Sequence, residues 1–147
     1  MKKICLILVV SLFYNTTLFA DKNMKIGFKG KLSDVTRTIE VKMYDNYYEP
    51  NTFKIKKGET VKFKVKNLGE LVHEFNIANP MMHIKHQPEM ELMVENEILL
   101  GDRIDKDKMQ KMAAMDKSMG HSHSNSVLLA PKEEGTLIWK FENAVNI

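Results

Sequence analysis

Alternation of apolar and polar residues constrains the fold of this chain more than any other feature. From Thr60 to Lys66, the apolar residues Val61, Phe63 and Val65 alternate with lysines and a threonine. A two-residue period is typical of a β-strand with one face buried and the other in water. Similar short patterns, separated by turn residues, predict further strands at 35–43, 53–55, 72–77, 127–129 and 136–141. Together these patterns predict an all-β fold, an antiparallel β-sandwich.

The segment at about 81–123 breaks this pattern. It contains little alternation and few β-branched residues. Met109, Met112, Met115 and Met119 recur at spacings of three, three and four, which places them on one face of a helix. Gly120 follows as a helix stop. The sequence therefore predicts a sandwich that carries one helical insertion.

Composition narrows the possible function classes. The 147 residues are 44% hydrophobic and 28% charged, which is typical of a globular domain. The formal net charge of +3 is too small for a dedicated nucleic-acid-binding protein, so no nucleic-acid partner is expected. The one cysteine, Cys5, excludes an internal disulfide and a multi-cysteine zinc site among these residues. Because no motif for a nucleophile or a paired-carboxylate site is present, we expect a binding protein and not an enzyme.

The N-terminal residues have the pattern of a secretory signal peptide. Lys2 and Lys3 precede an apolar run over residues 4–13, and Ala20 precedes Asp21. The run is shorter than the about 20 apolar residues that a membrane span requires. We therefore expect a signal peptide at 1–20, a single domain at 21–147 located in the periplasm, and no membrane span after cleavage. Cys5 is then removed with the signal peptide.

Methionine and histidine are concentrated in the insertion. Eight of the eleven methionines and four of the five histidines lie there or directly after it. Thioether sulfur suits Cu(I) and imidazole suits Cu(II) and zinc, so a segment with both is able to hold copper. Two alternatives stay open: the methionines at helical spacing pack against the sandwich, which we prefer for 109–119, and the histidines are simply exposed. The candidate metal ligands of this segment are Met81, Met82, His83, His86, His121 and His123.

The residues from Asn51 to Ile77 resemble the cupredoxin signature. That family reads P-x-x-F-x-[IV]-K-x-G-[ED]-x-[VI]-x-[FW]-x-[VF]-x-N, with H-[ED]-F a few residues later, as at residues 73–75 here. The segment 130–141 is similar to the A-P-x-E-x-G-x-L-x-W-x-F segment of exported cupredoxin-like copper-resistance proteins. The resemblance implies a cupredoxin-like Greek-key β-sandwich, with copper as its metal and His73 as the first imidazole ligand of a blue-copper site.

The resemblance also implies ligands beyond those in this sequence. In the family, a final strand and a C-x-x-P-G-H loop with a methionine ligand follow the W-x-F strand, whereas this sequence ends at Ile147. We therefore expect the last strand to be absent and the chain to be truncated. The type 1 (blue-copper) site is then expected to be incomplete, because it needs a cysteine thiolate.

The main functional hypothesis is an exported copper-binding protein with a role in copper handling or resistance. It binds a copper ion through His73 and the insertion, without a blue-copper centre, and another copper-handling protein of the envelope is its expected partner. One alternative is a non-metal interaction module or a truncated remnant without function. The other is an electron-transfer cupredoxin that is completed by a missing C-terminal segment.

Overall fold

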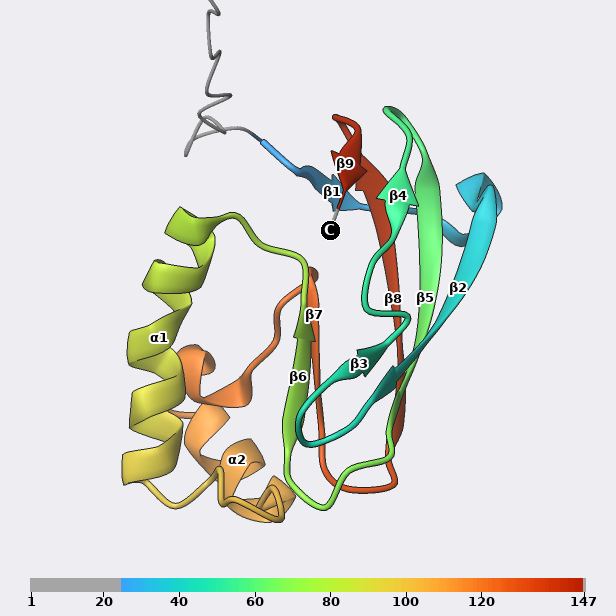
Figure 1. Ribbon diagram of the computed structural model, residues 1–147. Coiled ribbons are helices and arrows are strands. Elements are labelled where there is room, and N and C mark those ends of the chain that lie inside the picture. Colours follow the sequence, from blue (N-terminus) through green and yellow to red (C-terminus); the bar gives the residue numbers. More distant parts are fainter. Residues whose placement is uncertain (1–24, 147) are drawn as a thin grey trace, which may run out of the picture.

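The chain folds into a β-sandwich with a helical insertion on one side (Figure 1). The computed structural model describes residues 25–146, so the predicted signal peptide lies outside the described residues. The strands are β1 (Gly27–Lys29), β2 (Arg37–Met43), β3 (Tyr48–Glu49), β4 (Lys54–Ile55), β5 (Thr60–Asn67), β6 (His73–Asn76), β7 (Ser126–Leu129), β8 (Glu134–Phe141) and β9 (Val145–Asn146). The helices are α1 (Pro80–Glu95) and α2 (Lys106–Ala113), with the short 3₁₀ helices η1 (Leu32–Asp34) and η2 (Lys117–Gly120). Among these residues, no helix combines the length and the apolar character that crossing a membrane requires.

Five strands form the larger sheet, in the order β1-β8-β5-β2-β3. β5 and β8 pair antiparallel from Thr60 opposite Lys140 to Lys66 opposite Glu134, whereas β2 runs parallel to β5. The parallel pairing arises because the chain passes through β4, outside this sheet, before it returns as β5. Two smaller sheets, β4–β9 and β6–β7, contribute to the same core. The predicted sandwich is confirmed, with the correction that its larger sheet is mixed and not wholly antiparallel.

The end of the described chain also differs from the expectation of an absent last strand. Val145 and Asn146 form the short strand β9, which pairs antiparallel with β4. Val145 lies opposite Ile55, and both side chains contribute to the sandwich core. The described residues therefore include two residues of a strand after β8.

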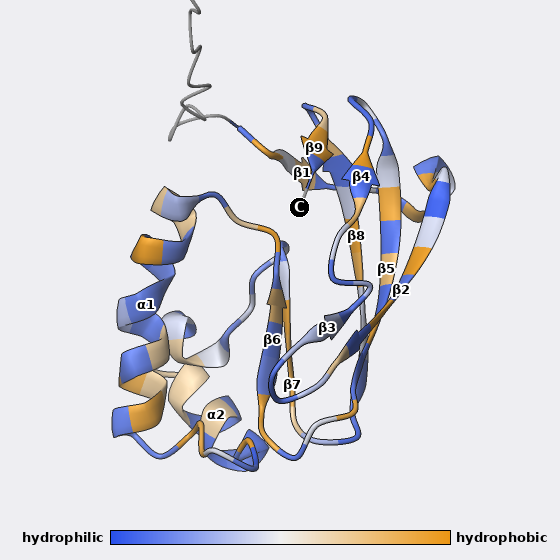
Figure 2. Ribbon diagram, viewed as in Figure 1, coloured by the Kyte–Doolittle hydropathy of each residue, from blue (hydrophilic) through white to orange (hydrophobic). Residues whose placement is uncertain are grey.

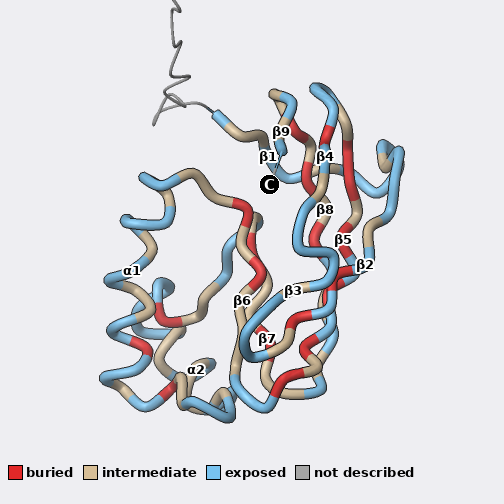
Figure 3. Tube along the Cα trace, in the orientation of Figure 1, coloured by how far each residue is buried: buried red, intermediate tan, exposed pale blue. Residues whose placement is uncertain are grey.

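The sandwich core lies between the larger sheet and the smaller ones. Alternate residues of β2, β5 and β8 face it, including Val41, Phe63 and Trp139, and Figure 2 shows this alternation along β5. The Phe63 ring centroid lies 5.2 Å from that of Phe75 and 6.3 Å from that of Phe141. Figure 3 shows more of the buried residues on the strands than on the helices. The alternation predicted from the sequence thus becomes a buried apolar face, whose removal from water drives folding.

The insertion has a second, smaller core built largely from methionine. Unbranched thioether side chains fill the irregular space between α1, α2 and η2. The buried residues of this methionine core and the side chains packed against them are Met93, Ile98, Met119, Met90, Leu99, Met109, Met112 and Leu128. Met109, Met112 and Met119 are therefore packing residues, with the correction that they pack in a core of the insertion, which meets the sandwich at Leu128.

The prediction that one helix carries the methionines of 109–119 is wrong. Helix α2 ends at Ala113, and η2 forms a separate turn. Asp116 causes the break, because its side chain accepts the backbone N–H of Ser118 and caps η2. Met115 lies between the two helices and is 81% exposed, so it does not share the buried face.

Helix α1 adds a second long element that the methionine spacing did not predict. It begins at Pro80. Proline suits the first position of a helix, because its φ is already helical and its missing N–H would have no partner within the helix there. Asn79 caps it, with Oδ1 accepting the backbone N–H of Met82 at 2.8 Å. In Figure 1, α1 lies on the outer side of the β6–β7 ribbon.

The β6–β7 ribbon separates the two cores. Its strands pair antiparallel, with Glu74 opposite Leu128 and Phe75 opposite Val127. Phe75 and Val127 pack in the sandwich core, whereas Leu128 packs in the methionine core. Because side chains alternate along a strand, Glu74 faces the insertion. Its neighbour His73 lies on the other face of the ribbon. Glu74 and His73 therefore have different surroundings, although they are adjacent in the sequence.

Candidate metal centre

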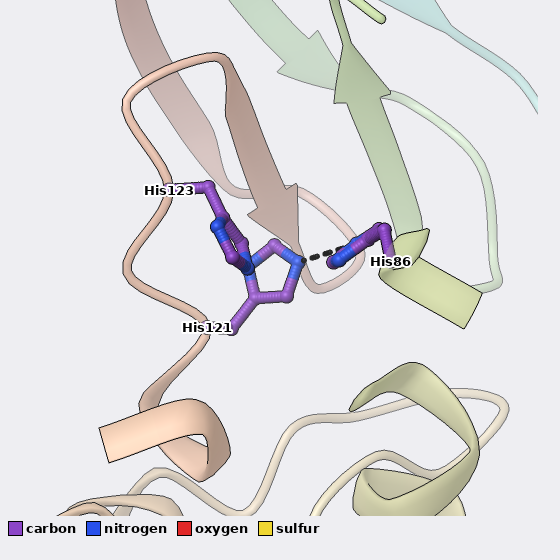
Figure 4. Close-up of side chains that lie close together, drawn as sticks. All are labelled: His86, His121 and His123. Atoms are coloured by element: carbon purple, nitrogen blue, oxygen red, sulfur yellow. Dashed lines mark hydrogen bonds between the residues drawn. The ribbon is translucent and has the colours of Figure 1, made fainter. Parts of the chain in front are cut away.

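Three histidines of the insertion come together beside the β6–β7 ribbon (Figure 4). His86 lies on α1, and His121 and His123 follow η2. Each offers one ring nitrogen, and these three atoms lie within 4.8 Å of one another. His86 Nε2 and His121 Nε2 are 3.3 Å apart. We call these three residues the histidine cluster.

His121 occupies a backbone conformation that is uncommon for a residue with a side chain. Its φ of 44° and ψ of 47° lie in the left-handed region, directly after Gly120. Glycine and asparagine are the residues normally favoured there. The His121 side chain is nevertheless only 4% exposed. A buried side chain held on a strained backbone supports a functional role for His121.

Helix α1 presents one face to the histidine cluster. Met82, His86 and Glu89 follow one another at spacings of four and three, which places them on the same side of the helix. Together with His123 they line a recess of about 250 Å³. The helical register of α1 therefore places the His86 side chain on the side that faces the other two histidines.

Two carboxylates border the histidine cluster. Glu74 Oε1 lies 3.2 Å from His86 Nε2 and 3.2 Å from His121 Nε2. The two oxygens of Glu89 lie 2.9 and 2.8 Å from His123 Nε2, and Glu89 Oε2 is 3.7 Å from His86 Nδ1. The side chains of Glu74 and Glu89 are 15% and 14% exposed. The site therefore combines imidazole nitrogens with shielded carboxylate oxygens.

The Glu74 carboxylate is stabilised in its charged form. Burial raises the pKa of Glu74, but hydrogen bonding, first with His121, and the electrostatic influence of the His121 and His86 rings lower the pKa to about 2. Glu74 is consequently an anion at neutral pH. It is able to accept hydrogen bonds from imidazole N–H groups or to bind a cation.

The other predicted ligands of the insertion lie at the edge of the cluster or away from it. Met82 lines the recess beside His86. Met81 is 38% exposed. His83 is exposed on α1, where its Nε2 accepts a hydrogen bond from the Gln87 side-chain amide at 3.2 Å. The structure therefore brings His86, His121 and His123 together, with Met82 alongside, and leaves His83 outside.

His73 has a different environment, on the other face of β6. Its Nε2 is hydrogen-bonded to Asp45 Oδ1 at 3.0 Å, and its ring meets Tyr48 edge to face. Asp45 also accepts the backbone N–H groups of Glu70 and Leu71. The hydrogen bond from His73, followed by those from the backbone, holds the pKa of Asp45 below its usual value. His73 is not part of the histidine cluster, and its role as a blue-copper ligand stays a prediction.

Glu74 and Glu89 are absent from the ligands predicted from the sequence. Glu89 follows His86 by three residues, which is a helical spacing, but that signal depends on predicting α1. Glu74 belongs to a strand pattern whose alternation assigns it to the face opposite the sandwich core. The insertion covers that face, and the sequence pattern alone does not reveal it.

Comparison with known proteins agrees with this architecture. A family model described as a cupredoxin-like domain matches residues 4–104. A β-sandwich with this match defines a cupredoxin-like domain, so the resemblance found in the sequence is confirmed. The chain belongs to the cupredoxin-like family.

Two relatives carry the name copper-resistant cuproprotein CopI. The protein from Pseudomonas aeruginosa is 37% identical over 135 residues, an alignment that covers 82% of this chain and 70% of that protein. The protein from Rubrivivax gelatinosus is 26% identical over 125 residues, covering 84% of this chain and 62% of that protein. No solved structure matches the chain significantly.

Proposed function

We propose that this chain is a copper-handling protein that binds a copper ion at the histidine cluster. The observation that carries the proposal is the convergence of three imidazoles, with donor atoms within 4.8 Å of one another. They come from two segments that are 35 residues apart in the sequence. Three neutral imidazoles are a suitable ligand set for copper or zinc.

The choice of copper is supported by the relatives. Both relatives carry a name that describes a copper-resistant cuproprotein. Copper(II) also binds nitrogen and oxygen ligands more tightly than zinc does, in the general order of divalent metal affinities. We therefore propose copper as the ion and copper handling or resistance as the role, by binding and not by catalysis.

The proposal includes export and an incomplete type 1 site. The signal-peptide pattern at residues 1–20 supports export to the periplasm, where another copper-handling protein of the envelope is the proposed partner. Cys5 is the only cysteine of the 147 residues, so copper in this chain is proposed to bind without an intense thiolate band at about 600 nm. Mass spectrometry of the protein recovered from the periplasm tests export, with Asp21 as the expected first residue.

Calorimetric titration with Cu(II) tests the binding site. We expect one ion per chain in the wild type and an affinity at least about 100-fold lower in His86→Ala, since a direct ligand is lost. His83→Ala is the matched control, because His83 is on the same helix but outside the cluster, and it should keep the wild-type affinity. Equal loss in both variants, or no copper uptake by the wild type, contradicts the proposal and favours a non-metal interaction module.

A further inference from the structure

We infer that Glu74 is a direct ligand of the copper site alongside the histidine cluster, and that it makes the site selective for Cu(II) over Cu(I). The inference rests on the proposed function, because it assigns a further ligand and an oxidation state to the same site. It also extends the site from the insertion to the sandwich, since Glu74 belongs to β6.

The separations of three donor atoms carry this inference. Glu74 Oε1, His86 Nε2 and His121 Nε2 are separated by 3.2, 3.2 and 3.3 Å. Ligands of one tetrahedral ion lie about 3.3 Å apart when the bonds are about 2.0 Å long. The three atoms therefore already have the spacing of one face of a tetrahedral site. They come from β6, α1 and the segment after η2.

The position of Glu74 in the fold favours this role. Its side chain is 15% exposed and faces the insertion, with Leu128 opposite it on β7. A shielded carboxylate is costly unless it is paired with a cation or with hydrogen-bond donors. Both of its imidazole neighbours are members of the histidine cluster, so a bound ion satisfies the carboxylate and the imidazoles together.

Glu89 has a positioning role in this arrangement. It contacts His123 Nε2 with both oxygens and lies 3.7 Å from His86 Nδ1. A carboxylate beside one ring nitrogen of a ligand histidine fixes the ring orientation and raises its basicity. The close contact is with His123 Nε2, so Glu89 orients the His123 ring, and it borders His86 on the side turned away from Glu74.

The chemistry of the carboxylate sets the preferred oxidation state. Carboxylate oxygen is a hard ligand that suits divalent ions, whereas Cu(I) prefers soft sulfur. The anionic charge of Glu74 also attracts Cu(II) more strongly than Cu(I), since the ion carries twice the charge. Removing that charge should weaken Cu(II) binding more than Cu(I) binding.

Affinity measurements with both ions test the inference. Cu(II) and, under anaerobic reducing conditions, Cu(I) are titrated into the wild type, Glu74→Gln and Glu91→Gln in competition with a chelator. In Glu74→Gln, we expect the Cu(II) affinity to fall about 10- to 100-fold and the Cu(I) affinity to change less than about threefold. Glu91, exposed on α1, is the matched control and should leave both affinities unchanged.

The outcomes separate this inference from the proposed function. If the Cu(II) affinity is unchanged in Glu74→Gln, or if both affinities fall equally, Glu74 is not the selective ligand while copper binding itself stands. If the wild type binds neither ion, the proposed function fails as well. Should Glu74→Gln fold poorly, Glu74→Asp retains the charge but withdraws the oxygen, and an unchanged Cu(II)-to-Cu(I) affinity ratio there overturns the inference.

Discussion

The sandwich and the insertion of this protein are stabilised in different ways. The sandwich core consists mainly of aromatic and β-branched side chains on paired strands, with Phe63 at its centre. The insertion has a smaller core of flexible methionines around Met93. Stiff side chains specify one packing, whereas methionine adapts to irregular space. The difference suggests a division of labour, in which the sandwich supplies a fixed frame and the insertion supplies an adaptable set of ligands.

The two regions meet at the β6–β7 ribbon, where Glu74 contacts His86 and His121, and at an ion pair outside the ribbon. The ribbon contributes Phe75 to the sandwich core and Leu128 to the methionine core. Lys106 of α2 is hydrogen-bonded to Glu133, in the turn between β7 and β8. Because each region has its own core, we expect the insertion to unfold locally while the sandwich stays folded.

The largest effect is expected from Phe63→Ala. Phe63 is 1% exposed, and removing its ring should lower the free energy of unfolding by about 3–5 kcal/mol. Urea denaturation followed by circular dichroism measures the change. Phe28→Ala is the control, because Phe28 is 45% exposed and should cost about 1 kcal/mol or less. A similar small loss in both variants contradicts the placement of Phe63 at the centre of the sandwich core.

A smaller and more local effect is expected from Met93→Ala. Met93 is fully buried, and its truncation should cost about 2–5 kcal/mol within the methionine core. Hydrogen exchange should show lost protection in α1 and α2, with β5 and β8 unaffected. Met115→Ala is the matched control, since Met115 is 81% exposed and should change stability by about 0.5 kcal/mol or less. Equal loss of protection in β5 refutes the independence of the two cores.

Copper addition should stabilise the insertion more than the sandwich. At a free copper concentration 100-fold above the dissociation constant, binding contributes about 2.7 kcal/mol to the free energy of unfolding. Hydrogen exchange should place this gain in α1 and in the segment 120–123. His121→Asn should fold, because asparagine tolerates the left-handed backbone at this position, but copper should add no stability to its own metal-free form. If copper stabilises His121→Asn as strongly as the wild type, the histidine cluster is not the copper site.

The smallest effect is expected at the ion pair between the two regions. The hydrogen bond from Lys106 holds the pKa of Glu133 below its usual 4.5. Because the pKa of Glu133 is lower in the folded protein than in the unfolded one, the ion pair stabilises the fold above pH 4.5. This contribution is lost as the pH falls through the pKa that Glu133 has in the folded protein. Because the pair is partly exposed, its contribution is about 1 kcal/mol or less.

Unfolding experiments on the wild type and Glu133→Gln measure this contribution. The difference between the two proteins should be present at about pH 7 and shrink as the pH falls below 4.5. A difference that does not change with pH indicates that Glu133 acts by some means other than its charge.

Much of the sandwich is predictable because a two-residue period requires only local sequence. β5 illustrates this: Val61, Phe63 and Val65 alternate with polar residues and form one buried face. The parallel pairing of β2 with β5 is not predictable in this way, since it depends on where the intervening residues pack. The same limit applies to the break between α2 and η2, which a single cap at Asp116 decides.

The candidate site is predictable only in part. The enrichment of histidine in one segment identifies His86, His121 and His123 as candidates, but it identifies His83 equally. What separates them is the register of α1 and the left-handed backbone at His121, which are features of the three-dimensional structure. Glu74 is hidden for a similar reason, because alternation along β6 predicts a solvent face where the insertion in fact packs.

Copper K-edge X-ray absorption of the Cu(II)-loaded chain identifies the atoms that bind the ion. If the histidines of the insertion form the copper site while its methionines form a core, the spectrum should show a first shell of nitrogen and oxygen at about 2.0 Å, with the multiple-scattering pattern of imidazole. A first shell dominated by sulfur at about 2.3 Å, or one without imidazole, contradicts this assignment of the ligands.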